Sequence, residues 1–467
     1  MSKTGKAKLL STLVVISLFG ISQTIGANHL SGAKDPGVRG GPAGAGGPIP
    51  GLSGTQNDFF LAGKADFEER EEVDEGLGPR FNHIGCGPCH SQPATGGTSP
   101  VVNPQFTLAT TPPFNAKNDP PSFITLNGPV REARFVRNPD GSRDGGVHAL
   151  FVISEAPGAG GCNAVQEDFA KQVANRNIIF RIPTPTFGAG LIEAIPDATI
   201  KANLAAMAAQ KAQFGIFGKF NFINVSGDAN NNGNDGTISR FGWKAQNKSL
   251  LLFSGEAYNV EMGITNELFQ TERDENPTCQ FATVPNDVTD TNGAGGPATI
   301  SAIEKFAFFM RFLAPPTPVL SYQSANVGFV SSTSIARGRQ IFSDTGCALC
   351  HTPTLKTGNA TIAALRYQNA NLYSDVGLHG MGPGLADDVI QGQANGDEFR
   401  TSPLWGLGKR IFFLHDGRTT DLSRAIQEHK SAGNSQFGPS EANQVIDKYT
   451  NLSDDDTQDL LNFLRSL

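Results

Sequence analysis

The sequence has little positive charge. Its 37 lysines and arginines are outnumbered by 44 aspartates and glutamates, which gives a formal net charge of −7. A negatively charged chain is a poor ligand for nucleic acid and for anionic membrane surfaces, so we expect neither as a partner. A small molecule or a basic protein fits this charge better.

Long apolar runs are also missing after the first residues. The one run, 9–21, follows three lysines and precedes the small residues Gly26 and Ala27. This order is typical of a secretory signal peptide, whereas a membrane anchor, the alternative, needs about 20 apolar residues. We therefore predict a signal peptide over 1–27, cleavage near Ala27, and a periplasmic or secreted mature chain without a membrane span.

Cysteine is scarce, with six residues in 467, yet four of the six lie in two Cys-x-x-Cys-His motifs. From composition, chance would produce one such motif on the order of 10⁻³ times in this chain. In the motif the thiols add to the vinyl groups of haem and the histidine binds the iron, whereas a zinc site or a redox dithiol would not need the histidine twice. The sequence thus predicts two covalently bound c-type haems, attached through Cys86, Cys89, Cys347 and Cys350, with His90 and His351 as axial ligands.

The two remaining cysteines, Cys162 and Cys279, are candidates for a disulfide. Disulfides persist in an oxidising compartment such as the periplasm, which agrees with export. Two buried free thiols are the alternative, because the sequence gives no distance between them.

Glycine and proline are abundant, with 54 and 29 residues, which predicts long loops around short helices. The segment 28–57 is rich in both and too poor in large apolar residues to fold alone, so we expect a linker or a surface strap. Apolar spacing predicts a helix within 58–74, before the first haem motif, and a counterpart over 334–345, before the second.

Two short motifs repeat along the chain. Pro185-Thr-Phe-Gly-Ala-Gly190 is matched by Pro403-Leu-Trp-Gly-Leu-Gly408 at a constant offset of 218, the difference 403 − 185. A predicted helix over 302–313 ends at a proline-rich stretch that closes at Pro318 and marks a domain boundary. We predict a mainly α-helical chain of two cytochrome c-like lobes: an N-terminal haem domain over 58–318, with loop-rich insertions, and a C-terminal haem domain over 319–467.

One asparagine-rich loop, from Asp228 to Asp235, has oxygen-bearing side chains at alternate positions and a glycine at the turn. This pattern resembles the opening of a calcium loop, although Ser239 stands where the closing glutamate belongs. A bound calcium ion and an ordinary turn both remain open.

Four segments of the C-terminal part, 372–385, 399–408, 413–418 and 425–429, resemble the bacterial di-haem oxidoreductases, a family of peroxidase-like proteins. That family is related to the di-haem cytochrome c peroxidases and to the di-haem enzyme that matures methylamine dehydrogenase. The resemblance extends roughly from Gly76 to Leu467 and implies an oxidoreductase with two haems.

The resemblance also implies a second axial ligand for the C-terminal haem. In the peroxidase relatives it lies fourteen residues after the histidine of a His-x-Gly motif, which here leads from His415 to His429. Two imidazoles would give a low-spin iron that is closed to substrate. Met381 is the competing ligand, and a solvent-facing His429 is the third possibility. His415, Asp416 and Arg418 would shape the pocket of this haem or meet its propionates.

For the N-terminal haem, the resemblance implies that Glu261, in Asn259-Val-Glu261-Met262-Gly263, is an acid/base over its open face. The glutamine that precedes this glutamate in the relatives is missing, and a surface glutamate is the alternative. Trp243 falls where the relatives place a tryptophan between the haems, so it is either an electron relay or a packed aromatic.

These residues together predict reduction of a peroxide at the N-terminal haem. The electrons would come through the C-terminal haem from a donor protein such as a small cytochrome or a cupredoxin. Two other functions remain: an electron-transfer cytochrome without catalysis, and haem-dependent oxidation of a partner protein.

Overall fold

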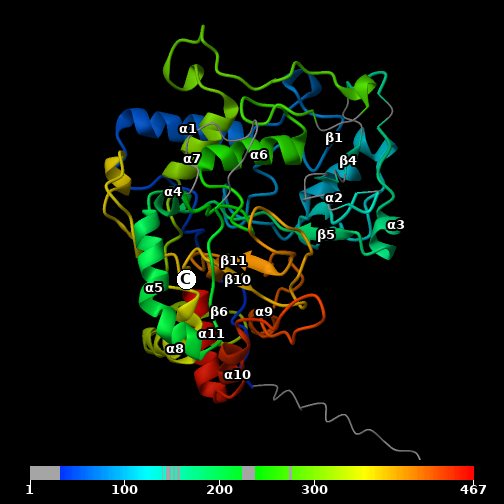
Figure 1. Ribbon diagram of the computed structural model, residues 1–467. Coiled ribbons are helices and arrows are strands. Elements are labelled where there is room, and N and C mark those ends of the chain that lie inside the picture. Colours follow the sequence, from blue (N-terminus) through cyan, green and yellow to red (C-terminus); the bar gives the residue numbers. More distant parts are fainter. Residues whose placement is uncertain are drawn as a thin grey trace, which may run out of the picture.

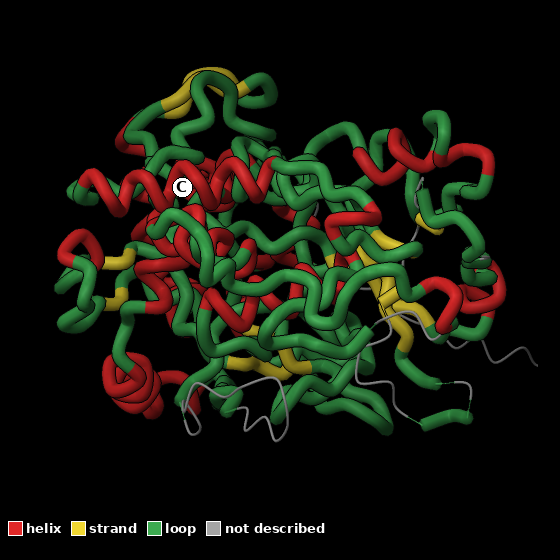
Figure 2. The backbone as a smooth tube through the Cα atoms, turned by 90° about the horizontal axis from the view of Figure 1, so that it is seen from above, coloured by secondary structure: helices red, strands yellow, loops and turns green. Residues whose placement is uncertain are grey.

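Short helices joined by long loops make up most of the protein. The computed structural model describes residues 32–138, 140–142, 149–150, 153–154, 158–162, 164–222, 237–272 and 276–467. In these residues the regular structure is mainly helical, with strands of at most four residues (Figure 2). The predicted signal peptide and the calcium-loop segment 228–235 lie outside the described residues.

The α-helices are α1 Gly54–Glu68, α2 Pro104–Ala109, α3 Phe169–Ala174, α4 Ala189–Glu193, α5 Asp197–Gln213, α6 Leu250–Met262, α7 Ala302–Phe312, α8 Ser332–Thr345, α9 Leu422–Gln427, α10 Asn443–Thr450 and α11 Asp454–Ser466. The strands are β1 Arg80–Phe81, β2 Glu132–Phe135, β3 Ala149–Leu150, β4 Ile153–Ser154, β5 Ile178–Arg181, β6 Tyr322–Ser324, β7 Gly328–Val330, β8 Leu355–Lys356, β9 Asn369–Ala370, β10 Leu378–Gly380 and β11 Glu398–Arg400. They form antiparallel pairs and one three-stranded sheet of order β3-β2-β5.

Helix α1 leads into the first Cys-x-x-Cys-His motif, as predicted. It begins earlier than expected because Ser53 forms a capping box with Gln56, in which each side chain accepts from the other residue's backbone N–H. Its buried residues Phe60 and Phe67 pack on α7, where both contact the ring of Phe309. The two helices approach so closely that a Cβ on Gly63 would lie 2.1 Å from the Lys305 carbonyl oxygen.

Helix α8 leads into the second motif in the same way. Ser331 caps its first turn, and Gly346, at φ 104°, ends it one residue before Cys347. Gly338 lies against α11, where a Cβ would come within 1.9 Å of the Asp459 carbonyl oxygen. Each motif therefore follows a helix that is fixed to a later helix through a glycine.

The repeated six-residue motifs end in equivalent contacts. A Cβ on Gly190 would lie 1.9 Å from the carbonyl oxygen of Arg311, next to the end of α7. A Cβ on Gly408 would lie 2.1 Å from the carbonyl oxygen of Arg465, next to the end of α11. The constant offset in the sequence thus reflects a shared packing need, because only glycine fits so close to another backbone.

The two largest hydrophobic clusters of the described residues surround these helices. The larger contains α1, α6 and α7 residues such as Phe67, Val260 and Phe309, and the other contains α8 and α11 residues such as Phe342 and Phe463. The two helix groups lie at opposite ends of the view in Figure 1.

The segment 32–53 is an ordered strap. The Asp35 carboxylate forms a buried ion pair with Arg465, at 2.6 and 2.7 Å, in α11. Further along, the Ile49 N–H donates to the Phe312 carbonyl oxygen at 2.7 Å, at the end of α7. The strap therefore contacts the last residues of both core helices.

Two further findings concern the predicted disulfide and the predicted lack of a membrane span. A disulfide joins Cys162 and Cys279, whose Cα atoms are 4.8 Å apart. None of the helices in the described part of the chain is both long and apolar enough to cross a bilayer.

The α8–α11 contact gives a stability test. Gly338→Ala inserts a methyl group against the Asp459 carbonyl oxygen, so we expect a loss of about 1–3 kcal/mol in the free energy of unfolding, although alanine normally favours a helix. Thermal unfolding followed by circular dichroism measures the change. The control is Gly54→Ala in α1, which has no atom within 4 Å and should change stability by less than about 0.5 kcal/mol. Equal stability of the two variants would contradict this packing argument.

Candidate functional site

The first Cys-x-x-Cys-His motif turns tightly at the end of α1. The Gly87 N–H donates to the Phe67 carbonyl oxygen at 2.8 Å, and the His90 N–H donates to that of Cys86 at 3.1 Å. Cys86, Cys89 and His90 thereby line one side of a cavity with about 1130 Å³ of empty space. We call it cavity 1.

The second motif turns in the same way. Gly346 ends α8, and the His351 N–H donates to the Cys347 carbonyl oxygen at 2.9 Å. Cys347, Cys350 and His351 line cavity 2, which has about 1400 Å³ of empty space. The four motif cysteines are free thiols, so they remain available for covalent attachment.

Three histidines are prepared for binding iron. The Nδ1 atom of His90 lies 2.9 Å from the Gly97 carbonyl oxygen, that of His351 lies 3.0 Å from the Tyr373 carbonyl oxygen, and that of His429 lies 2.8 Å from the Ala425 carbonyl oxygen. A carbonyl only accepts, so each Nδ1 carries the proton, and Nε2 of His351 and of His429 keeps its lone pair. The His90 ring also meets a second backbone carbonyl, that of Thr184. Burial lowers the pKa of His90 and His351 to about 4 and also lowers that of His429, which keeps all three imidazoles neutral at neutral pH.

His429 and Met381 both line cavity 2, as the sequence predicts for the rival ligands. Met381 packs in an apolar cluster with Trp243 and Phe399. His429 already carries the hydrogen bond that fixes a ligating tautomer, which favours it over the thioether. Which of the two binds the iron stays a prediction.

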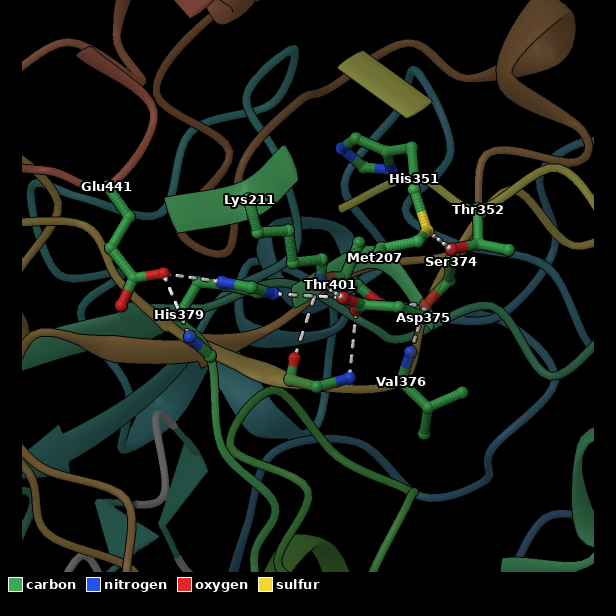
Figure 3. A network of polar contacts seen from close by, with 12 residues as sticks. Met207, Lys211, His351, Thr352, Ser374, Asp375, Val376, His379, Thr401 and Glu441 are labelled. Carbon is green, nitrogen blue, oxygen red and sulfur yellow. Dashed lines mark hydrogen bonds and ion pairs between the residues drawn. The ribbon is translucent and has the colours of Figure 1, made fainter. Parts of the chain in front are cut away.

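His379 also lines cavity 2, but both of its ring nitrogens are engaged (Figure 3). Nδ1 lies 2.7 Å from a Glu441 oxygen and Nε2 lies 3.1 Å from an Asp375 oxygen. Asp375 also pairs with the buried Lys211 of α5 at 2.6 Å. Burial alone would raise the pKa of Asp375, but His379 and Lys211 hold it below its usual value. His379 is therefore part of a scaffold that fixes the loop after the second motif, and is unsuited to bind metal.

Glu261 lines cavity 1, where α6 ends. Its Oε2 atom accepts from Asn82 Nδ2 at 2.7 Å, and its side chain also hydrogen-bonds Glu132. Burial raises the pKa of Glu261 well above its usual range, and the charge of Glu132 raises it further. Glu132 forms an ion pair with Arg134 on the same wall. A titratable carboxyl thus faces the space beside the first motif.

Trp243 lines both cavities and is fixed on each side. Its Nε1–H donates to the Ile182 carbonyl oxygen at 3.0 Å, and its own carbonyl oxygen accepts from the Arg400 N–H at 2.9 Å. The edge of its ring faces His415, with ring centroids 6.4 Å apart, and His415 stacks on Phe399 at 4.4 Å. One indole therefore forms the shared wall of the two cavities.

Buried guanidinium groups test whether the cavities fit haem, which carries two propionates. Arg400 and Arg410 line cavity 2, and neither forms an ion pair with a carboxylate of the described residues. Burial lowers the pKa of each to about 10, with a further effect from a neighbouring arginine, so both remain charged at neutral pH. On cavity 1, the Nε atom of Arg181 is buried without a hydrogen-bond partner. Arg181 itself pairs with Asp387 at 2.8 Å, so its Nε–H is the part that lacks a partner. Propionates would supply the missing anions of Arg400 and Arg410, and the residues fit the group.

Sequence reasoning missed these residues. Asp416 and Arg418, expected at the second haem, pair with each other at 2.8 Å and do not line cavity 2, whereas His415 does. Arg400 lies in 399–408, one of the four segments that resemble the di-haem family. This position in the sequence was the signal that could have identified it as a site residue. Glu132 and Arg134 lie in β2, far from either motif in the sequence, and no motif marks them.

His83 also lines cavity 1, and its Nδ1 atom is buried without a partner. Burial lowers the pKa of His83 to about 4. Met262 and Met310 line the same cavity. These three side chains are the neutral groups near the first motif that could supply a further ligand.

Two cavities, each with a Cys-x-x-Cys-His motif, define a class of protein: the redox proteins with two haems. Comparison with protein families makes this specific, because residues 158–467 match the family described as "Di-haem oxidoreductase, putative peroxidase". The match covers about two thirds of the chain, and the chain belongs to this family. The resemblance seen in the sequence is confirmed, although the matched residues begin after the first motif.

Solved structures resemble parts of the chain. One is a hydrazine synthase from Kuenenia stuttgartiensis, with 17% identity and a TM-score of 0.22, covering 37% of this chain and 58% of that chain. Another is a MauG-like protein associated with microbial copper homeostasis, with 18% identity and a TM-score of 0.22, covering 36% of this chain and 52% of that chain. The matched regions thus span little more than half of these proteins. No curated protein matches the chain.

Covalent attachment can be counted. We expect the purified protein to give two c-type haems per chain in a pyridine haemochrome assay, because both motifs have free thiols beside an imidazole. Replacing Cys86 and Cys89 together by alanine should remove one haem, and replacing Cys347 and Cys350 should remove the other. Cys162→Ser with Cys279→Ser is the control, which should keep both haems. Fewer than two haems in the unchanged protein would contradict the assignment.

Proposed function

We propose that the chain is an exported di-haem c-type oxidoreductase that reduces a peroxide at the N-terminal haem, with electrons relayed from the C-terminal haem. The observation that carries the proposal is the shared wall: Trp243 separates a cavity with a titratable carboxyl from a cavity with two free imidazoles. The two sites differ in their side chains and share one indole. This arrangement is consistent with catalysis at cavity 1 and electron supply from cavity 2.

The proposed architecture is two cytochrome c-like lobes, over 58–318 and 319–467. The equivalent glycine contacts support it, since α1 meets α7 through Gly63 as α8 meets α11 through Gly338. Gly190 and Gly408 extend the same correspondence. The three-stranded sheet and the disulfide loops belong to the part that would be inserted in the first lobe.

In the second lobe, His351 and His429 would hold the iron from two sides. Both imidazoles are neutral and present Nε2, and Arg400 and Arg410 would bind the propionates. Two imidazole ligands leave no position for substrate, so this site would pass electrons.

In the first lobe, His90 would hold the iron and Glu261 would move a proton between the two peroxide oxygens. Bound haem supplies the redox chemistry that breaks the O–O bond. The protein contributes a water-poor wall of apolar residues, such as Phe253 and Phe306, and a carboxyl whose raised pKa favours its protonated form.

Trp243 would relay the electrons. Its Nε1–H donates to the Ile182 carbonyl oxygen, which cannot take up the proton, so the indole can lose and regain an electron without losing that proton. The edge-on contact with His415 continues the aromatic wall toward cavity 2.

The proposed location is the periplasm or the outside of the cell, after cleavage near Ala27. The disulfide between Cys162 and Cys279 supports an oxidising compartment. The net charge of −7 supports a basic electron donor, such as a small cytochrome or a cupredoxin. Steady-state reduction of hydrogen peroxide with a reduced donor of this kind tests the function directly; no turnover would contradict it.

A second candidate, an electron carrier without catalysis, is favoured by one observation. His83, with its unpartnered Nδ1, and Met262 both line cavity 1 and could close the iron there. The number of haem irons that lack a sixth protein ligand distinguishes this electron carrier from the proposed peroxide-reducing enzyme.

Electron paramagnetic resonance of the ferric protein counts those sites. We expect one low-spin iron, at cavity 2, and one high-spin iron, at cavity 1, because only the first lobe should lack a sixth protein ligand. Two low-spin signals, with cyanide unable to bind, would favour the carrier. His429→Ala should convert the low-spin signal of cavity 2 into a high-spin signal, whereas Met381→Leu should leave the low-spin signal unchanged. The reverse result would make Met381 the ligand.

The relay role of Trp243 gives a kinetic test. Trp243→Phe keeps an aromatic ring but is much harder to oxidise, so we expect turnover with the donor to fall at least tenfold while cyanide binding at the first haem is kept. The matched control is Trp405→Phe, since Trp405 is the other tryptophan, is equally buried and lines neither haem cavity. Similar turnover in both variants would reduce Trp243 to a packing role.

A further inference from the structure

A second carboxylate stands beside Glu261 on the wall of cavity 1. Glu132 and Arg134 are two residues apart in β2, so their side chains leave the same face of the strand, and both line the cavity. Helix α6 brings Glu261 and Glu256 to the same wall. The carboxyls have separate anchors: Glu132 pairs with Arg134, Glu261 accepts from Asn82, and Glu256 accepts from Asn247.

The charges of this cluster do not balance. All three carboxyls act on Arg134, and their charges raise the pKa of Arg134 against the effect of burial. Three partly buried carboxylates around one guanidinium would leave two negative charges that this guanidinium does not compensate, which is costly where contact with water is reduced. A proton held within the cluster removes part of this cost. The hydrogen bond between Glu132 and Glu261 requires it, because two carboxylates have no hydrogen to share.

We propose that Glu132 and Glu261 hold one proton between them and act as a single acid–base unit on the peroxide. This inference rests on the proposed function. A protonated Glu261 can donate but cannot accept, so a base is needed beside it. Glu132, which forms an ion pair with Arg134, is positioned to be that base.

The proton steps balance in the overall reaction H₂O₂ + 2 e⁻ + 2 H⁺ → 2 H₂O. Glu132 accepts the proton of one peroxide oxygen, and Glu261 donates its proton to the other oxygen. The O–O bond breaks and the oxygen that received the proton leaves as water. The pair again holds one proton, now on Glu132. Two electrons from the donor protein and two protons from solvent then convert the remaining oxygen to the second water.

A double-mutant cycle tests whether the pair is a unit. We expect Glu132→Gln and Glu261→Gln each to lower kcat/KM for hydrogen peroxide by roughly 10²-fold, within the range of general acid–base catalysis. The double variant should be no worse than the poorer single variant, because residues that act together are not additive. Losses that multiply, or a Glu132→Gln variant with unchanged kcat/KM, would overturn the proposal.

The pH profile separates a proton-sharing role from a structural one. A pair that holds one proton fails when it gains a second at low pH and when it loses its proton at high pH, so kcat/KM should be bell-shaped. In Glu132→Gln a single carboxyl needs only to be ionised, so the high-pH limb should disappear. The other titratable or charged groups that line this cavity are Arg134, Arg181, Glu256, Tyr258 and His83, together with His90 and the two cysteines of the first motif. Glu256→Gln makes the same charge change on a carboxyl that is bonded to Asn247, so it should shift the position of the two limbs and keep both.

Cyanide binding to the ferric protein tests the pair of Glu132 and Glu261 without requiring turnover of peroxide. Hydrogen cyanide must leave its proton on a base when it binds, so Glu132→Gln should weaken cyanide binding about tenfold at neutral pH, measured by optical titration. Glu132→Asp keeps the charge and the pair with Arg134, so it should recover part of the affinity for cyanide. This recovery would show that the weaker binding in Glu132→Gln is not caused by a folding defect. Unchanged cyanide binding in Glu132→Gln would overturn the pair. If the unchanged protein binds cyanide in this way but fails to reduce peroxide, the proposed function fails and the proton-sharing pair stands.

Discussion

The close contact of backbones at four glycines is the constraint on which both sites depend. Gly63 and Gly338 let α1 and α8 approach a later helix, and each of these helices ends next to a Cys-x-x-Cys-His turn. The direction in which the cysteines and the histidine leave the chain is therefore set by helix packing as well as by the motif. A side chain larger than hydrogen would separate the helices and move the motif with them.

The two cavities are built alike but carry opposite charge. Cavity 1 gathers Glu132, Glu256 and Glu261, whereas cavity 2 has Arg400 and Arg410, neither of which is ion-paired with a carboxylate of the described residues; the carboxylate of Glu441, which also lines cavity 2, is bound to His379. An acidic wall suits proton transfer, and a cationic wall suits a bound dianion such as a haem with ionised propionates. Repetition supplied the framework, and different side chains on it gave the two sites different chemistry.

Local patterns in the sequence predicted much of this arrangement. The two haem motifs and the helices before them could be predicted because each depends on neighbouring residues. The pairing of Cys162 with Cys279 followed from counting the cysteines that lie outside the motifs. Glu132 and Arg134 could not be predicted in this way, because β2 reaches cavity 1 only through pairing with β5 and packing beside α6. Asp416 and Arg418 were expected at the second haem because they adjoin His415, but they pair with each other outside the cavity. Adjacency in sequence predicts a contact poorly when the residue lies in a turn.

The strap over 32–53 has a consequence for the order of folding. Asp35 binds Arg465 near the end of the chain, and Ile49 binds Phe312 at the end of α7. These contacts join residues hundreds of positions apart, so they can form only after both later helices exist. The first described residues are accordingly the last to settle during folding, and until then the ends of α7 and α11 stay uncovered.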